Sequence, residues 1–312
     1  MCSPCDVCLR IFNWKNRAYG LLLMCLTTAI AAQSQTFASL HSFDGTDGAN
    51  PYGELVQATD GNFYGTTAEG GANGQGTVFK ITPNGTLTTL YNFCSKSNCT
   101  DGALPYSGLV QATNGNFYGT TIEGGASGSG TVFRITQSGT LTTLHSFCSE
   151  SGCTDGGNPY AALVQATDGN FYGTTFVDGA NNAGTVFRIT PSGALTTIYT
   201  FCSQSCADGG NTYAGLIQAA NGDFYGTTID GGTFGFGTVF KITPSGTLTA
   251  LYSFCSVEPG CTDGAMPYGA LVQGADGNFY GTTALNGGGA NGPDGTVFKM
   301  TPRGTLTTLH SF

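Results

Sequence analysis

Short runs in which hydrophobic and polar residues alternate recur along most of this chain, separated by glycine-rich turns. The clearest run is Thr77–Thr82, where Phe79 and Ile81 share one face and Val78 and Lys80 share the other. The runs are rich in β-branched and aromatic residues, which favour strands. Beyond the N-terminal leader, no segment shows convincing helical periodicity. The pattern therefore predicts an all-β protein.

Four such runs follow one another in a fixed order, and the set occurs five times. In the first complete set they are Glu54–Ala58, Asn62–Thr67, Thr77–Thr82 and Leu87–Phe93. Tight turns join the first run to the second and the third to the fourth, whereas the other two connections are long loops. Asp60-Gly61 and its equivalents in the first turn suit the positive φ angles of tight hairpins. The Phe-Tyr-Gly-Thr-Thr motif of the second run marks a period of about 54 residues, beginning at Phe63, Phe117, Phe171, Phe224 and Phe279.

Four antiparallel strands per unit, repeated around a ring, describe a β-propeller. We expect one such domain over residues 36–312, with five blades at 53–93, 107–147, 161–201, 214–254 and 269–312. The fourth run has a sixth copy at residues 37–43. This surplus outer strand could be displaced, extend a blade to five strands, or belong to a longer repeat array. Another all-β repeat stack, such as a β-solenoid, is the alternative fold.

Composition supports folding and argues against one class of partner. Glycine accounts for 50 of 312 residues and charged residues for 9%, against about 25% in an average protein. Hydrophobic residues make up 40% in ordered spacing, which indicates a folded chain rather than a disordered one. The formal net charge is −9. Nucleic acid is therefore not expected as a partner, because phosphate contacts need clustered Lys and Arg.

Residues 1–32 do not match the repeat. Arg10, Lys15 and Arg17 precede the apolar run Ala18–Ala32, which ends in small residues. This is the pattern of a secretory signal peptide, and the run is shorter than the roughly 20 residues of a membrane span. A retained membrane anchor is the alternative. We expect a secreted, periplasmic or cell-surface protein with no transmembrane segment after cleavage.

The recurring motifs also carry a family resemblance. Asp-Gly-Asn-Phe-Tyr-Gly-Thr-Thr, Gly-Thr-Val-Phe-Lys-Ile-Thr-Pro and Gly-Thr-Leu-Thr-Thr-Leu-Tyr resemble the tandem repeat of bacterial GloVer-type (choice-of-anchor) proteins, over residues 36–312. The resemblance implies an exported bacterial protein, often attached to the surface by a varying C-terminal signal. No such signal follows Phe312 in this sequence, which leaves anchoring open. The resemblance implies no particular activity.

Eight cysteines lie in pairs within the long loops between successive units. The pairs are Cys94/Cys99, Cys148/Cys153, Cys202/Cys206 and Cys255/Cys261. In an exported protein this spacing favours four disulfides, each clipping its own loop. Metal binding is the alternative, but each loop offers two thiols and only one has a nearby imidazole, His145. We therefore expect neither a metal ion nor a cofactor.

Two sets of residues on the long-loop side are candidates for ligand binding. One set is a tyrosine before the first strand of each unit: Tyr52, Tyr106, Tyr160, Tyr213 and Tyr268. The other is an acidic residue in the loop between the second and third strands: Glu69, Glu123, Asp178 and Asp230, with Asn286 in the last unit. Tyrosines around a channel mouth suit flat ligands such as sugars, whereas the simpler interpretation is packing at blade junctions. The acidic residues could form a rim that binds Ca²⁺ or a cationic partner, whereas the simpler interpretation is solvated loop charges.

Catalysis needs different residues in different roles and should therefore break the repeat symmetry. The breaks are few: Glu54 stands where other units have Gly or Ala, and His41, His145 and His310 replace a tyrosine in the fourth run. No nucleophile or phosphate-binding motif is present. We expect a monomeric, exported, non-catalytic binding or scaffold propeller whose ligand is an extracellular polysaccharide or a surface protein. The alternative is an extracellular glycan hydrolase or lyase that uses carboxylates on the long-loop side.

Overall fold

Five sheets of four strands each form the described part of the chain, which comprises residues 38–257, 260–285 and 294–312 of this computed structural model. We number these sheets as blades 1 to 5 in chain order. The innermost strands are β1 (Val56–Gln57), β5 (Val110–Gln111), β9 (Val164–Gln165), β13 (Ile217–Gln218) and β17 (Val272–Gln273). The second strands are β2 (Phe63–Thr67), β6 (Phe117–Thr121), β10 (Phe171–Thr174), β14 (Phe224–Thr228) and β18 (Phe279–Thr283). The third strands are β3 (Thr77–Ile81), β7 (Thr131–Ile135), β11 (Thr185–Ile189), β15 (Thr238–Ile242) and β19 (Thr296–Met300). The outer strands are β4 (Leu87–Asn92), β8 (Leu141–Ser146), β12 (Leu195–Thr200), β16 (Leu248–Ser253) and β20 (Leu306–Ser311).

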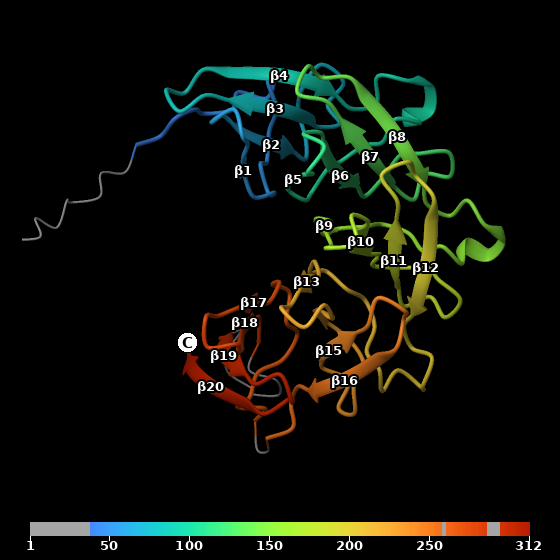
Figure 1. Cartoon of the computed structure of the whole chain (residues 1–312), viewed down its shortest axis with the longest axis vertical. Coiled ribbons are helices and arrows are strands. Elements are labelled where there is room, and N and C mark those ends of the chain that lie inside the picture. The colour runs from blue at the N-terminus through green and yellow to red at the C-terminus, as the bar shows by residue number, and fades with distance from the viewer. Residues whose placement is uncertain (1–37, 258–259, 286–293) are drawn as a thin grey trace, which may run out of the picture. The chain divides into compact units, whose positions relative to one another are not determined.

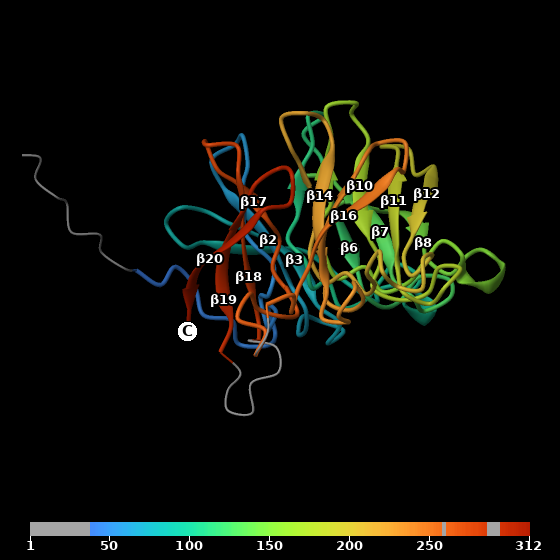
Figure 2. The same cartoon turned by 90° about the horizontal axis from the view of Figure 1, so that it is seen from below.

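Each blade is an antiparallel meander in which consecutive strands are neighbours, from β1-β2-β3-β4 to β17-β18-β19-β20. Figure 1 shows the short inner strands on the inside and the longer outer strands on the outside. Seen from the side, the strands of successive blades stand next to one another (Figure 2). This is the β-propeller arrangement that the sequence predicts. The leader (1–32), Asn286 and Phe37 lie outside the described residues.

The Phe-Tyr-Gly-Thr-Thr motif is explained by the pairing of the second and third strands. Gly65 lies opposite Phe79 in the register of β2 and β3. A Cβ at Gly65 would come within 2.7 Å of the Leu55 side chain and 2.8 Å of the Phe79 ring. The ring therefore folds over the glycine, and a side chain at this position would push it out of the blade.

The structure shows how the tight turns are built. Within Asp60-Gly61, only Gly61 has a positive φ, at 81°. The Gly61 N–H donates to the Ala58 carbonyl, and the Asp60 carboxylate accepts from the Asn62 N–H at 3.0 Å. The hairpin is thus a type I turn closed by a left-handed glycine, and the aspartate serves as an acceptor instead of adopting a positive φ.

Neighbouring blades pack through one repeated set of contacts. The ring of Tyr64 in blade 1 stacks on Phe117 in blade 2 at 4.2 Å, and Phe93 meets Phe133 edge-on at 5.2 Å. The Thr66 hydroxyl donates to the Ser107 carbonyl at 2.7 Å. Equivalent aromatic pairs join blades 2 and 3, 3 and 4, and 4 and 5, and each junction has its own buried hydrophobic cluster. The core of the protein is therefore the series of blade junctions.

Residues 39–43 of the surplus run lie against blade 1. The Leu40 carbonyl faces Gly85 as the Leu90 carbonyl of blade 1 faces Gly139 of blade 2. Phe43 meets Phe79 edge-on at 5.1 Å, like the Phe93–Phe133 pair. The segment thus follows the path of an outer strand belonging to a preceding blade, although no strand is assigned to it.

All four predicted disulfides are present, within the loops that connect one blade to the next: Cys94–Cys99, Cys148–Cys153, Cys202–Cys206 and Cys255–Cys261. Two of these loops also contain a short 3-10 helix, η1 (Ser97–Cys99) and η2 (Ser151–Cys153). Within the described ranges, no helix has the length and apolar character needed to cross a membrane.

Candidate functional site

The inner strands and the residues just before them line a cavity of about 770 Å³. All five blades contribute to it, from Tyr52 in blade 1 to Val272 in blade 5. Most of the lining is apolar and includes Leu109, Leu163 and Leu216. Glu54, which stands where the other repeats have Gly or Ala, supplies the one carboxyl group among these lining residues.

The five predicted tyrosines form a continuous aromatic row in the lining of this cavity. Consecutive ring centroids lie 5.0 Å, 5.8 Å, 4.5 Å and 5.2 Å apart, in the order Tyr52, Tyr106, Tyr160, Tyr213 and Tyr268. The two terminal rings are open to solvent, with Tyr52 62% and Tyr268 46% exposed, whereas the middle three are half-buried. The row therefore both connects adjacent blades and presents aromatic surface.

Phe176 packs against the middle of this row and was missed by the sequence reasoning. Its ring lies 5.4 Å from Tyr160 and 4.9 Å from Tyr213, edge-on to both. The corresponding residues of the other units are Ala or Ile. That break in the repeat was visible in the sequence. Its contact with the tyrosines could not be inferred, because the direction of the loop after β10 was not known.

The electrostatics place two of the acidic residues near the row. Burial raises the pKa of Tyr106, with further contributions from the neighbouring Tyr52 and the charges of Glu69 and Glu123. Burial and the neighbouring Tyr213 raise the pKa of Tyr160 to about 12. Tyr106 and Tyr160 are thus protonated at neutral pH, and their hydroxyls can donate hydrogen bonds.

The four acidic candidates differ in their exposure to solvent. Glu69 and Glu123 are exposed, whereas Asp178 and Asp230 are half-buried, and burial raises the pKa of Asp230. Backbone bridges tie three of them to the loop that enters the same blade, in the pairs Ala49–Glu69, Ala103–Glu123 and Gly210–Asp230. Among the described residues, no group of three His, Cys, Asp or Glu side chains is placed to hold a metal ion.

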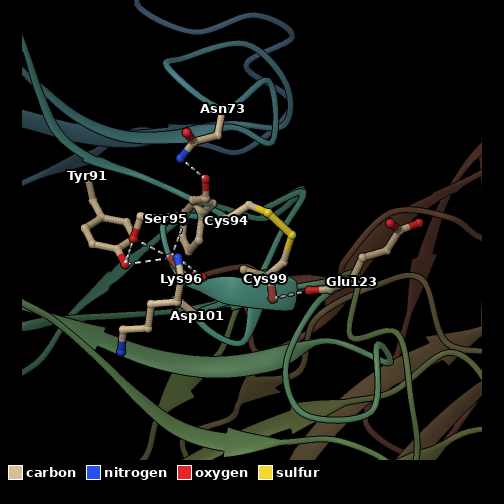
Figure 3. Close-up of a disulfide and its surroundings, with 10 residues drawn as sticks. Asn73, Tyr91, Cys94, Ser95, Lys96, Cys99, Asp101 and Glu123 are labelled. Carbon is tan, nitrogen blue, oxygen red and sulfur yellow. Dashed lines mark hydrogen bonds between the residues drawn. A yellow bond between two sulfur atoms is a disulfide. The ribbon is translucent and has the colours of Figure 1, made fainter.

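A buried aspartate in each cysteine-containing loop is a second feature that the sequence reasoning missed. Asp101 accepts hydrogen bonds from the Tyr91 hydroxyl at 2.7 Å and the Ser95 N–H at 2.9 Å, and its other oxygen accepts from the Lys96 N–H at 3.2 Å. Figure 3 shows this cluster beside the Cys94–Cys99 disulfide. Asp155, Asp208 and Asp263 are equally buried and occupy the same place in the other three loops.

An aspartate at this place is also the partner of two of the three histidines. The His145 Nε2 lies 2.9 Å from Asp155, where other blades place a tyrosine hydroxyl, and His41 makes the same contact with Asp47 at 2.6 Å. Burial acts to raise the pKa of Asp101, but the hydrogen bonds from Tyr91 and Ser95 outweigh it and the pKa lies below its ordinary value. His and Tyr are therefore alternative partners for one carboxylate, and the arrangement orders the loop.

Together these observations define a β-propeller with a tyrosine-lined cavity and clipped loops on one face. Residues 26–154 and 151–312 match the Gloeobacter/Verrucomicrobia repeat, so the chain belongs to this repeat family. No curated protein matches the sequence.

Among solved structures, two similar chains share the fold. The extracellular domain of BT3049 from B. thetaiotaomicron, described as a hybrid two-component system, is 14% identical with a TM-score of 0.51, over 81% of this chain and 28% of that one. Puromycin hydrolase is 13% identical with a TM-score of 0.51, over 83% of this chain and 37% of that one. A protein described as a gluconolactonase has a TM-score of 0.47 at 14% identity, over 84% and 78% of the two chains. The chain spans about a third of the length of the first two, and likeness at these identities concerns the fold.

Proposed function

We propose that this protein is an exported propeller that binds extracellular polysaccharide through its tyrosine row. The observation that carries the proposal is the continuity of the five rings along a cavity of about 770 Å³. Sugar rings present apolar C–H faces and peripheral hydroxyls, and a tyrosine offers an apolar face and a polar tip. Several adjacent tyrosines can therefore hold successive sugar units with little charge involved.

Two further observations support export. The leader has the pattern of a secretory signal, and four loops are closed by disulfides, which persist in oxidising compartments. A polysaccharide outside the cell is a ligand that such a protein would meet. A surface protein is the other class of ligand that an aromatic, weakly charged face could take.

Binding fits the site better than catalysis does. Glycosidases use two carboxyl groups about 5 to 9.5 Å apart, and the residues that line this cavity contribute one, Glu54. Asp230, whose pKa burial raises, is not among the lining residues. A glycan hydrolase or lyase is the second candidate, and the experiment below separates the two.

A glycan array tests the proposal, followed by a reducing-sugar assay on every glycan that binds. The two exposed ends of the row give the variants Tyr52→Ala and Tyr268→Ala, which we expect to weaken binding at least tenfold. Phe234→Ala is the matched control, because Phe234 is 46% exposed and does not line the cavity. Binding without release of reducing ends supports the proposal, turnover supports the enzyme, and silence on a broad array would point to a protein ligand.

A further inference from the structure

The four blade junctions share a fixed set of contacts. The side chains that a further junction would need can therefore be predicted. At each junction the earlier blade presents a tyrosine from its second strand and a phenylalanine at the end of its outer strand. The later blade presents a phenylalanine from its second strand and one from its third. A threonine hydroxyl from the earlier blade and a glutamine from the later blade complete the set, as in Thr66–Ser107 and Thr59–Gln111.

Blade 5 presents the first half of this set to solvent. Phe312 is 69% exposed, whereas its equivalents Phe93, Phe147, Phe201 and Phe254 are fully buried. Tyr280 is half-buried and Thr282 is exposed, although the same positions are buried in blades 1 to 4. Val272 of the inner strand is 65% exposed. No ring partner for Tyr280 from another blade is present within the described residues.

Blade 1 presents the second half. Phe63 is half-buried, although Phe117, Phe171, Phe224 and Phe279 are fully buried by the tyrosine of the preceding blade. Gln57 is exposed, whereas Gln111 accepts a hydrogen bond from the preceding blade at 3.1 Å. The position of the preceding outer strand is already taken, because Phe43 lies on Phe79.

Residues 39–43 follow the path of an outer strand but have no third strand beside them in the part of the chain that the structure describes. In every blade the N–H of the last outer-strand phenylalanine donates to the glycine before the third strand, as in Phe93–Gly76 and Phe312–Gly295. Within the described residues, the Phe43 N–H has no such acceptor. The segment has the path of an outer strand but lacks the third strand that would pair with it.

We propose that this open end is a docking site for a three-stranded segment of the same repeat. The segment contributes an inner, a second and a third strand, and residues 39–43 serve as its outer strand. Its second-strand phenylalanine packs on Tyr280 and its third-strand phenylalanine on Phe312. Its tyrosine covers Phe63, and its pre-strand glycine accepts from the Phe43 N–H. The exposed junction residues of blades 5 and 1 then all have partners, and the new junctions repeat the contacts of the four existing ones.

A second complete copy satisfies this chemistry less well. If blade 5 of one molecule met blade 1 of another, Phe312 would need the place on Phe79 that Phe43 already occupies. The Phe43 N–H would also remain unpaired. We therefore commit to the three-stranded segment and use self-association as a contrary outcome. The inference does not depend on what the tyrosine row binds.

The probe is a peptide with the sequence of residues 106–136, which contains the first three strands of blade 2 and their loops. We expect a 1:1 complex by calorimetry and slowed hydrogen exchange at the Phe43 amide. The control peptide carries Phe117→Ala and Phe133→Ala, the two rings that would meet Tyr280 and Phe312. On the protein, Tyr280→Ala and Phe312→Ala should each weaken binding at least tenfold.

If the peptide is insoluble, the same segment can be tested as a fusion to the protein. Joining the sequence of residues 94–136 after Phe312 places the same segment in reach, and we expect a higher melting temperature than for the double-alanine fusion. Equal melting temperatures of the two fusions would overturn the proposal. So would a chain that forms oligomers on its own and loses them on Phe312→Ala, since a second copy would then occupy the open end.

Discussion

At the scale of single residues, Asp101 is the clearest test of the loop architecture. Its side chain is fully buried and accepts four hydrogen bonds: one from Tyr91, two from Ser95 and one from Lys96. In Asp101→Ala these donors lose their acceptor, so we expect the free energy of unfolding to fall by about 1–3 kcal/mol. Chemical denaturation measures this, with Glu150→Ala in an exposed position as the control. Equal stability of the two variants would show that the carboxylate does not order the loop.

The tyrosines make stability depend on alkaline pH. Burial raises the pKa of Tyr64, Tyr172 and Tyr252 to about 12, from an ordinary value near 10, and the neighbouring aspartates contribute. The folded state therefore holds protons that the unfolded chain releases first. Stability is fully present below about pH 10 and falls as the pH rises toward 12.

Melting temperatures measured between these limits, together with tyrosinate absorbance, check this expectation. Tyr64→Phe removes one of the titrating groups and should make the decline less steep. A melting temperature that stays constant up to pH 12 would contradict it.

Residue types were easier to predict than residue roles. The cysteine pairs could be assigned from the sequence because two thiols in one short loop have few other partners. The histidines were interpreted as packing substitutes for tyrosine, and the structure adds the reason, since both reach the same buried aspartate. That aspartate recurs in every cysteine-containing loop, but burial cannot be inferred from recurrence alone.

At the scale of elements, the disulfides stabilise single loops. Cys148 and Cys153 close a ring of only a few residues between β8 and β9. Removing the bond by Cys148→Ser with Cys153→Ser should lower the free energy of unfolding by about 2 kcal/mol, by the loop-entropy relation. The same comparison in the presence of reductant is the control, because the difference between variant and parent should then vanish. A difference that survives reduction would mean that the serines act through packing.

Strand order and pairing followed from the alternation of hydrophobic residues, whereas strand lengths did not. The inner run was predicted as Glu54–Ala58, but pairing is confined to Val56–Gln57, and Glu54 and Leu55 line the cavity instead. An inner strand has only one neighbouring strand, so its length is set by how far β2 runs beside it. The turn at Asp60-Gly61 was located correctly, and of its two residues only Gly61 adopts the positive φ that the motif suits.

At the scale of the five-blade unit, the period of about 54 residues was sufficient to predict five four-stranded blades. The use of the surplus run was left open, because residues 37–43 and 306–312 both match the outer strand of a single blade. The structure places residues 39–43 against blade 1, through Leu40 and Phe43. The five described blades leave the groups at these two ends, such as Phe312, without a junction partner.

The contrast between Phe147 and Phe312 tests whether the two ends stay open in solution. Both close an outer strand, but Phe147 is fully buried against Phe187, whereas Phe312 is 69% exposed. Truncating a buried aromatic ring removes its burial and leaves a cavity, so Phe147→Ala should cost about 3–5 kcal/mol of unfolding free energy. Phe312→Ala should change it by no more than about 0.5 kcal/mol, as is usual for surface substitutions. If urea denaturation gave equal losses, the Phe312 ring would have to be buried in solution, either against blade 1 of the same molecule or against a second copy. The docking site would then already be closed.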